Sequence, residues 1–168
     1  IMGLLQTQLR VKKGCFVMVG DMNEERVEMA ASMGAHYTIN PHKEHAEKRI
    51  MKITHGRKAR AVFDTTPAAS VVEEACRYVG NMGKLMIYSG IYPNKPVQMD
   101  AHWIHKGSIQ ILGTANSNDR DFVRAARMVS EGVIDLKPFV SAVYESEQIK
   151  EAFESAIQGD KFRVVVKF

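Results

Sequence analysis

The stretch Cys15-Phe16-Val17-Met18-Val19-Gly20-Asp21 decides how this sequence is interpreted. Its apolar run is too short and too uniform for a surface strand, so it predicts a buried strand of a parallel sheet over residues 15–19. The run ends at a glycine and an acidic residue. A lone glycine, Gly3, stands eighteen positions before Asp21, near the start of a segment with helical spacing.

The elements next to this strand can be predicted from spacing and capping residues. Apolar residues between Met2 and Val11 recur at helical spacing, and the helix should end at Lys12-Lys13-Gly14, because cations and glycine favour a helix C-terminus. Asn23 is a suitable N-cap for a second helix, which Gly34 would end. A short strand is expected at His36–Ile39.

The same alternation continues along the chain. Further helices are predicted at 43–54, 68–79, near 102–105 and at 119–131, and further strands at 59–63, 84–88 and 108–112. Strands separated by helices of about 10–15 residues indicate βαβ units and a parallel sheet. The fold class is therefore α/β, a Rossmann-type doubly wound parallel sheet. Its first, central strand would precede Ile1, between the strands at 15–19 and 59–63, and so would be missing from this sequence.

The pattern changes near residue 139. A strand at 139–144, a helix at 147–157 and a strand at 162–168 follow one another. We therefore expect two parts, a nucleotide-binding domain over 1–138 and a closing strand-helix-strand segment over 139–168.

Composition limits the classes of protein to consider. The 168 residues are 45% apolar and 25% charged, as in ordinary globular domains. The net charge of +4 is spread along the chain without interleaved aromatic residues, which argues against nucleic-acid binding. No apolar run reaches membrane-spanning length, so no membrane partner is expected. Cys15 and Cys76 lie in apolar segments and are predicted to be buried thiols of a cytoplasmic protein.

Parallel sheets of this kind bind ligands at the carboxyl ends of their strands. Three predicted ends carry suitable residues: Gly20-Asp21, Asp64-Thr65-Thr66 and Ser89-Gly90-Ile91. The Asp21 carboxylate could accept hydrogen bonds from both ribose hydroxyls of NAD and would repel the 2′-phosphate of NADP. Taken alone, Asp21 could equally be an acid stabilised at a helix N-terminus. With Gly3 as the last glycine of a G-x-G-x-x-G loop, the sequence favours NAD binding and begins inside that loop.

Several segments together resemble one family, the medium-chain zinc-dependent dehydrogenases, in particular the alcohol, sorbitol and threonine dehydrogenases. The resemblance covers all 168 residues but only the C-terminal, cofactor-binding portion of such an enzyme. In chain order the matching segments are Ile1-Met2-Gly3-Leu4-Leu5, Asp21 to Arg26, Gly34 to Asn40, Val62 to Thr66, Gly83 to Gly90, Ile111-Leu112-Gly113-Thr114, and Glu147 through Lys167.

The resemblance implies roles for individual residues. Arg26 would reach the adenosine ribose, although by itself it could be a solvated cation on its helix. Arg163 would approach the pyrophosphate, although it could also be an exposed residue of an edge strand. The full implied NAD-binding set is Gly3, Asp21, Met22, Arg26, Thr65, Thr66, Ser89, Gly90, Ile91, Thr114, Asn116 and Arg163.

The resemblance also implies an activity, the NAD-dependent transfer of a hydride from a primary or secondary alcohol carbon of a small alcohol or polyol to nicotinamide. Catalytic zinc, its ligands and most of the substrate pocket would belong to an N-terminal domain outside this sequence. We therefore expect no catalytic residue and no metal ligand here, weak NAD binding at best, and no turnover by these residues alone. The histidine pairs His42/His45 and His102/His105 lack the third ligand that catalytic zinc needs.

In relatives of this family, the outer edge strand of the cofactor sheet pairs with the same strand of a second subunit. The resemblance therefore implies a homodimer or homotetramer formed through the strand Ser108–Leu112.

Three alternative functions share part of this sequence pattern. A zinc-free quinone or enoyl reductase shares the fold but usually prefers NADPH, against which Asp21 argues. A non-catalytic nucleotide-sensing module would bind NAD without chemistry. A methyltransferase also has an acid after its second strand, but it lacks the long match of segments.

Overall fold

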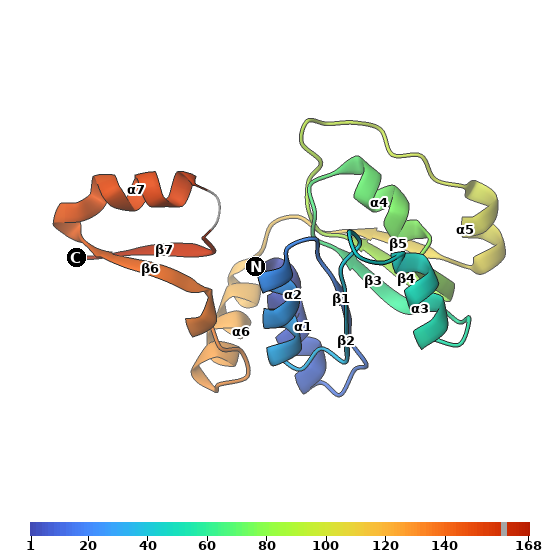
Figure 1. Ribbon diagram of the computed structural model, residues 1–168, viewed down its shortest axis with the longest axis horizontal. Coiled ribbons are helices and arrows are strands. Elements are labelled where there is room, and N and C mark those ends of the chain that lie inside the picture. Colours follow the sequence, from blue (N-terminus) through green and yellow to red (C-terminus); the bar gives the residue numbers. More distant parts are fainter. Residues whose placement is uncertain (159–160) are drawn as a thin grey trace. The chain divides into compact units, whose positions relative to one another are not determined.

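The computed structural model describes residues 1–158 and 161–168 (Figure 1). The chain divides into two compact units, one formed by Met2–Asn118 and the other by Asp119–Phe168 with Ile1.

The Met2–Asn118 unit alternates helices and strands, as the sequence predicts. Its elements are α1 (Met2–Lys12), β1 (Met18–Gly20), α2 (Glu24–Ser32), β2 (Tyr37–Ile39), α3 (Ala46–Ile53), β3 (Ala59–Asp64), α4 (Ala69–Cys76), β4 (Val79–Ile87), α5 (Ala101–Gly107) and β5 (Gln110–Gly113). All its strand pairs are parallel, β1 with β2 and β3 with β4 with β5. The predicted parallel α/β architecture is confirmed.

The strands of this unit form two sheets (Figure 1). β1 pairs Met18 to Gly20 with Tyr37 to Ile39 of β2. Among the described residues, no strand pairs with the second edge of β1 or with the edge of β3 that faces away from β4. Arg60 and Ala61 of β3 are accordingly exposed. These two edges flank the position that βαβ connection rules give to the central strand.

Two clusters of buried side chains stabilise the sheets. The larger cluster lies between α4 and the β3–β4–β5 sheet, and the smaller one lies between β2 and α3. The Tyr78 ring packs against both clusters and so connects the two sheets. The members are Val72, Ala75, Val79, Leu85 and Ile109 in the first, and Ile39, Ala46 and Ile50 in the second.

Helix α1 is a second connection between the sheets. The Arg10 guanidinium lies 4.6 Å from the centre of the Phe63 ring of β3. On the α2 side, the Gln8 amide donates to the Met33 sulfur at 3.7 Å. The C-terminal half of α1 is thereby held against both β3 and the end of α2.

The predicted end of α1 and the predicted N-cap of α2 are confirmed. Gly14 has a φ of 72°, and the following Cys15 N–H donates to the Arg10 carbonyl at 3.0 Å, which closes α1. At the start of α2, the Asn23 side chain accepts from the Arg26 N–H at 3.0 Å. These caps fix the chain direction on both sides of β1.

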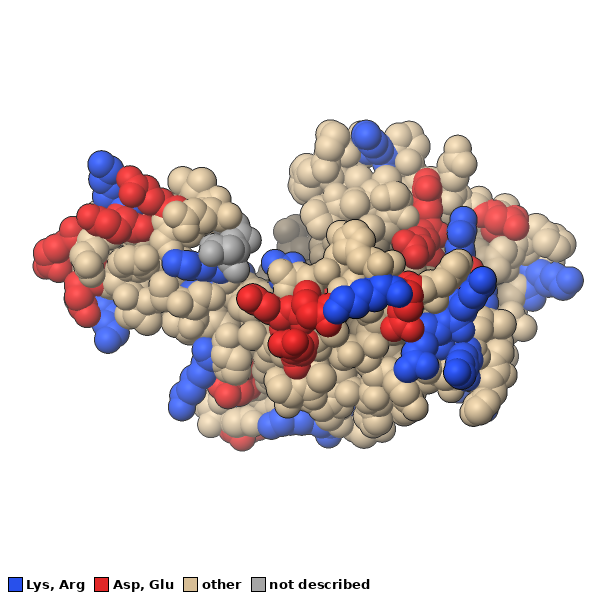
Figure 2. Space-filling model, in the orientation of Figure 1, with Lys and Arg blue, Asp and Glu red and all other residues tan. Residues whose placement is uncertain are grey.

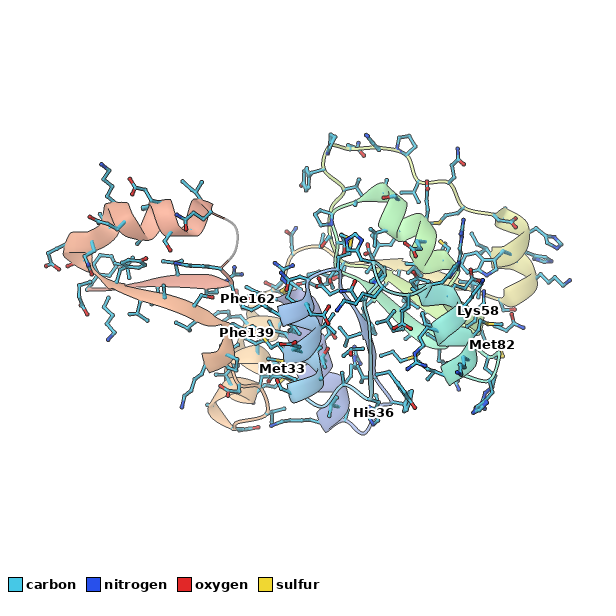
Figure 3. All side chains as sticks on the ribbon, in the orientation of Figure 1. Met33, His36, Lys58, Met82, Phe139 and Phe162 are labelled. Carbon is cyan, nitrogen blue, oxygen red and sulfur yellow. The ribbon has the colours of Figure 1, made fainter. Side chains whose placement is uncertain are left out.

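The predicted strand at 15–19 is wrong at its start. β1 begins at Met18 and is only half-buried, and Cys15 and Phe16 are exposed, so the expectation of a buried Cys15 thiol is also wrong. The centre of the Phe16 ring instead lies 4.7 Å from the centre of the His36 ring. His36 lies in the turn before β2 (Figure 3). Hydrophobicity alone could not separate this surface aromatic contact from a core position.

The predicted start of β4 is wrong as well. Helix α4 ends at Cys76, earlier than expected, and β4 begins at Val79 instead of residue 84. Gly80 allows the backbone of β4 to approach the Arg57 carbonyl, since a Cβ there would lie 2.1 Å from that oxygen. The pairing of β3 with β4 shifts register at this point. The apolar residues up to Val79 recur at helical spacing, so the sequence predicted a helix up to the residue at which β4 begins.

The second unit contains α6 (Asp119–Ser130), the 3₁₀ turns η1 (Lys137–Phe139) and η2 (Ser146–Gln148), β6 (Val140–Glu145), α7 (Ile149–Ile157) and β7 (Arg163–Lys167). β6 and β7 pair in parallel, with α7 between them in sequence. The rings of Phe139 and Phe162 meet edge to face at 5.8 Å (Figure 3). The order strand, helix, strand matches the prediction.

Within the described part of the chain, none of the helices combines the length and the apolar character needed to cross a membrane.

Candidate functional site

The carboxyl ends of β3, β4 and β5 meet at one edge of their sheet. The Tyr88 N–H donates to the Asp64 carbonyl at 2.9 Å, which ties the end of β4 to that of β3. The Thr114 N–H donates to the Ile87 carbonyl at 3.3 Å, which ties the segment after β5 to β4. This edge therefore carries the predicted residues Thr65, Thr66, Ser89, Gly90, Ile91 and Thr114.

Gly3 lies at this edge too, near the start of α1. A Cβ placed on Gly3 would lie 3.4 Å from the Thr65 hydroxyl oxygen, so the first turn of α1 faces the segment after β3. The Thr7 hydroxyl donates to the Gly3 carbonyl at 2.9 Å and fixes that turn. A helix of eleven residues presents unpaired N–H groups at its N-terminus, which favour an anion.

Asp21 directly follows β1 at the corresponding edge of the other sheet. Its N–H donates to the Ile39 carbonyl of β2 at 3.2 Å. One carboxylate oxygen, Oδ1, accepts from the Asn23 N–H at 2.9 Å, and Oδ2 lies 4.0 Å from the Arg26 guanidinium. About a third of the Asp21 side chain is exposed (34%), and the N-cap of α2 is Asn23 rather than Asp21. The carboxylate is thus ordered, accessible and next to a cation.

The segment after β4 presents backbone groups. A Cβ on Gly90 would lie 3.0 Å from the Tyr92 ring, so that ring packs closely against the backbone at this glycine. The Tyr92 N–H donates to the Pro67 carbonyl at 3.4 Å and connects this segment to the one after β3. Thr114 and Asn116 are exposed after β5, and Asn116 has a φ of 61°.

Asp64 is a residue to which sequence reasoning gave no role of its own. It is 4% exposed, its Oδ1 accepts from the Thr66 N–H at 3.2 Å, and among the described residues its Oδ2 has no hydrogen-bond partner. Burial raises the pKa of this carboxyl above its usual value. Alternation along β3 could have revealed it, because Asp64 lies on the same face as Val62, which packs against the core.

Asn40 is a second residue that the sequence did not single out. It follows β2, is 8% exposed, and donates through Nδ2 to the Glu24 carboxylate at 2.8 Å. Glu24 also pairs with Lys43 at 2.9 Å, and these two hydrogen bonds, that from Lys43 first, lower the pKa of Glu24. Figure 2 shows acidic side chains over α2 and basic ones over α3 on the face it presents.

Arg163 is the one predicted site residue that lies in the other unit. It begins β7, is exposed, and its Nη1 donates to the Phe162 carbonyl at 3.2 Å. Its predicted contact with a pyrophosphate stays a prediction.

The residues that the structure describes do not fit a zinc site. Among them, no three His, Cys, Asp or Glu side chains converge as a metal ion would require. The arrangement instead suits a ligand with hydroxyl and anionic groups, because it offers a carboxylate, hydroxyls and backbone N–H groups at the strand ends.

Comparisons with known proteins agree with this geometry. A family model described as zinc-binding dehydrogenase matches residues 2–131. The chain is 25% identical over 167 residues to D-arabitol-phosphate dehydrogenase of Enterococcus avium, covering 98% of this chain and 47% of that protein. It is 26% identical over 150 residues to an NAD-dependent alcohol dehydrogenase of Sulfolobus acidocaldarius, covering 87% and 41%.

The fold is shared with solved structures. A short chain alcohol dehydrogenase from E. coli CFT073, complexed with cofactor NADH, matches with a TM-score of 0.85 and 19% identity over 99% of this chain and 49% of that one. The chain thus spans about half the length of the proteins it matches. Because the family model covers well over half of its residues, the chain belongs to the zinc-binding dehydrogenase family.

Proposed function

We propose that the Met2–Asn118 unit is the NAD-binding part of an alcohol or polyol dehydrogenase. The observation that carries this proposal is the ordered, accessible carboxylate of Asp21 at the end of β1, in a chain of the zinc-binding dehydrogenase family. A carboxylate at this position can accept hydrogen bonds from the two ribose hydroxyls of an adenosine.

The other strand ends would hold the rest of the dinucleotide. The N-terminus of α1, where Gly3 meets Thr65, would face the pyrophosphate, because helix N–H groups favour anions and glycine permits close approach. Thr66 and the backbone of Ser89 to Ile91 would lie along the nicotinamide side, with Thr114 and Asn116 beside them. Met22, 58% exposed next to Asp21, would cover the adenine.

The proposed cofactor is NAD rather than NADP. A 2′-phosphate would bring two negative charges against the Asp21 carboxylate, whose single nearby cation, in the described ion pairs, is Arg26. The NAD-dependent relative from Sulfolobus acidocaldarius and the NADH complex from E. coli support the same preference.

The proposed reaction is hydride transfer between an alcohol carbon and nicotinamide. Bound NAD supplies the hydride acceptor, and the residues described here would bind and orient it. In this proposal their part is confined to binding and orienting the cofactor, and turnover would require the rest of such an enzyme. The D-arabitol-phosphate dehydrogenase relative supports a polyol as the substrate class. The zinc of such an enzyme would be held by residues other than these.

We further propose a homodimer or homotetramer in the cytoplasm, formed through the edge strand β5. β5 pairs with β4 on one side, and Leu112 on it is 37% exposed. An apolar edge strand is suited to pairing with a second copy. Light scattering that returned the mass of a monomer would contradict this.

Calorimetric titration of the protein with NAD tests the cofactor proposal. We expect saturable binding at one site, and the Asp21→Ala variant should bind about tenfold or more weakly, since a hydrogen bond to a charged group contributes about 1.5–3 kcal/mol. Glu28→Ala is the matched control, because Glu28 is an exposed acid on α2. Absence of NAD binding, or equal losses in both variants, would refute the proposal.

A further inference from the structure

We propose that Asn40 is a positioning residue that holds the Asp21 loop, and that it thereby sets the preference for NAD over NADP. This inference rests on the proposed NAD-binding function. Asn40 lies outside the set of residues that would contact the cofactor. Its buried amide would control the position of Asp21, which would bind the ribose.

The hydrogen bonds of Asn40 are the first observation. Its Nδ2 donates to the Met22 carbonyl at 3.3 Å and to the Glu24 carboxylate at 2.8 Å. Its Oδ1 accepts from the His42 N–H at 3.0 Å. Both amide hydrogens and the amide oxygen of a residue that is 8% exposed are therefore used. Only an amide supplies two donors and an acceptor at this point.

The placement of Asp21 between two hydrogen bonds to the end of β2 is the second observation. The N–H of Asp21 is held by the Ile39 carbonyl at 3.2 Å, and the carbonyl of the next residue, Met22, is held by the Asn40 side chain. The peptide group before Asp21 and the one between Met22 and Asn23 are thus held by two successive residues at the end of β2, and the N–H of the second group donates to Asp21 Oδ1. The direction of the carboxylate depends on both bonds.

The charge around the amide is the third observation. The Glu24 carboxylate receives the Asn40 amide on one side and the Lys43 ammonium on the other. The Lys43 N–H in turn donates to the Asn40 carbonyl at 2.9 Å. The start of α2 and the segment after β2 are therefore held together by one polar network whose central member is Asn40.

This network affects the preference for NAD over NADP, because that preference depends on the position of the Asp21 carboxylate. A fixed Asp21 accepts from a ribose 2′-hydroxyl and repels a 2′-phosphate at the same position. If the Met22 carbonyl is released, the carboxylate can turn away. Hydrogen bonds to NAD are then lost, and the repulsion of NADP weakens.

The variant Asn40→Asp tests this directly. It keeps an oxygen for the His42 N–H but places a second oxygen against the Met22 carbonyl and the Glu24 carboxylate, so both donated bonds are lost. The double variant Asn40→Asp with Glu24→Gln returns a donor to the contact between residues 40 and 24, yet leaves the Met22 carbonyl without one. Asn94→Asp, in an exposed loop, is the control for the change of charge.

The readouts are the thermal midpoint and the dissociation constants for NAD and NADP. We expect the ratio of the NADP constant to the NAD constant to fall about tenfold in Asn40→Asp and to stay low in the double variant, whose thermal midpoint recovers. Asn94→Asp should keep the wild-type ratio. If Asn40→Asp does not fold, the double variant decides.

A wild-type ratio in a folded Asn40 variant would overturn the positioning role while leaving the proposed function intact. Recovery of the ratio together with the thermal midpoint in the double variant would also overturn it, because the Met22 bond would then be irrelevant. If the wild-type protein binds no NAD, the proposed function fails first and this inference fails with it.

Discussion

Two aspartates at strand ends show how surroundings determine what an acid can do. Asp21 is partly exposed, bonded through Oδ1 to a backbone N–H and next to Arg26. Asp64 is buried, and among the described residues its Oδ2 has no partner. The first is suited to binding a ligand, whereas the second carries a desolvation cost when it is charged.

The substitution Asp64→Asn should stabilise the protein at neutral pH. Burial raises the pKa of this carboxyl, so the folded state prefers its neutral form, and stability is lost as the pH rises from the unfolded-state pKa through the folded-state pKa. An asparagine side chain keeps the oxygen that accepts from the Thr66 N–H and carries no charge. The free energy of unfolding at pH 7 should rise by about 1 kcal/mol, and the gain should vanish in acid.

Urea unfolding of the wild-type protein and of Asp64→Asn, at pH 7 and in acid, measures this difference. A variant that is less stable than the wild type at pH 7, or a gain that is the same under both conditions, would show that the Asp64 charge is not the source of the cost.

Individual site residues were predictable only where a residue type implies a role at a strand end. Asp21 and Gly3 stand out because an acid and a glycine have known uses at the ends of parallel strands. Asn40 does not, since its importance lies in three bonds to residues that are up to eighteen positions away in the chain. Such networks depend on how β2 and α2 pack together, which spacing does not reveal.

At the scale of elements, close backbone contact in the β3–β4–β5 sheet depends on glycine. Gly80 faces the Arg57 carbonyl, and a Cβ there would lie 2.1 Å from its oxygen. Gly113, in β5 of the same sheet, has no atom within 4 Å of such a Cβ. The two positions form a matched pair for substitution.

Gly80→Ala should lower the free energy of unfolding by about 2–3 kcal/mol, because backbone of β4 and of the turn after α3 must separate to admit the methyl group. Gly113→Ala should change it by less than about 0.5 kcal/mol. Equilibrium denaturation in urea provides both values, and equal effects at the two positions would contradict this account of the turn.

The type and order of the elements followed from the sequence more reliably than their bounds. Capping residues such as Gly14 and Asn23 marked helix ends correctly, because their roles are local. The starts of β1 and β4 were misplaced, since they depend on contacts of Phe16 and Gly80 with distant segments.

At the scale of the Met2–Asn118 unit, two parallel sheets present their carboxyl ends with different chemistry. The β1–β2 sheet ends in the Asp21 carboxylate, and the β3–β4–β5 sheet ends in hydroxyls and backbone groups near Gly3. The α/β class and its parallel pairing were predictable from alternating elements. The βαβ connection rules place a central strand between β1 and β3, whereas the division of the described strands into two sheets is seen only in the structure.

The most direct test of NAD binding at these strand ends is a ¹⁵N NMR titration of the 18.8 kDa chain with NAD. The account predicts that the largest shift changes fall on the amides of Asp21, Arg26, Thr65, Thr66 and Gly90. Gly56, Met82 and Gly83, which lie toward the amino ends of β3 and β4, should not move. Changes concentrated on those three residues, or no changes at saturating concentrations of NAD, would contradict it.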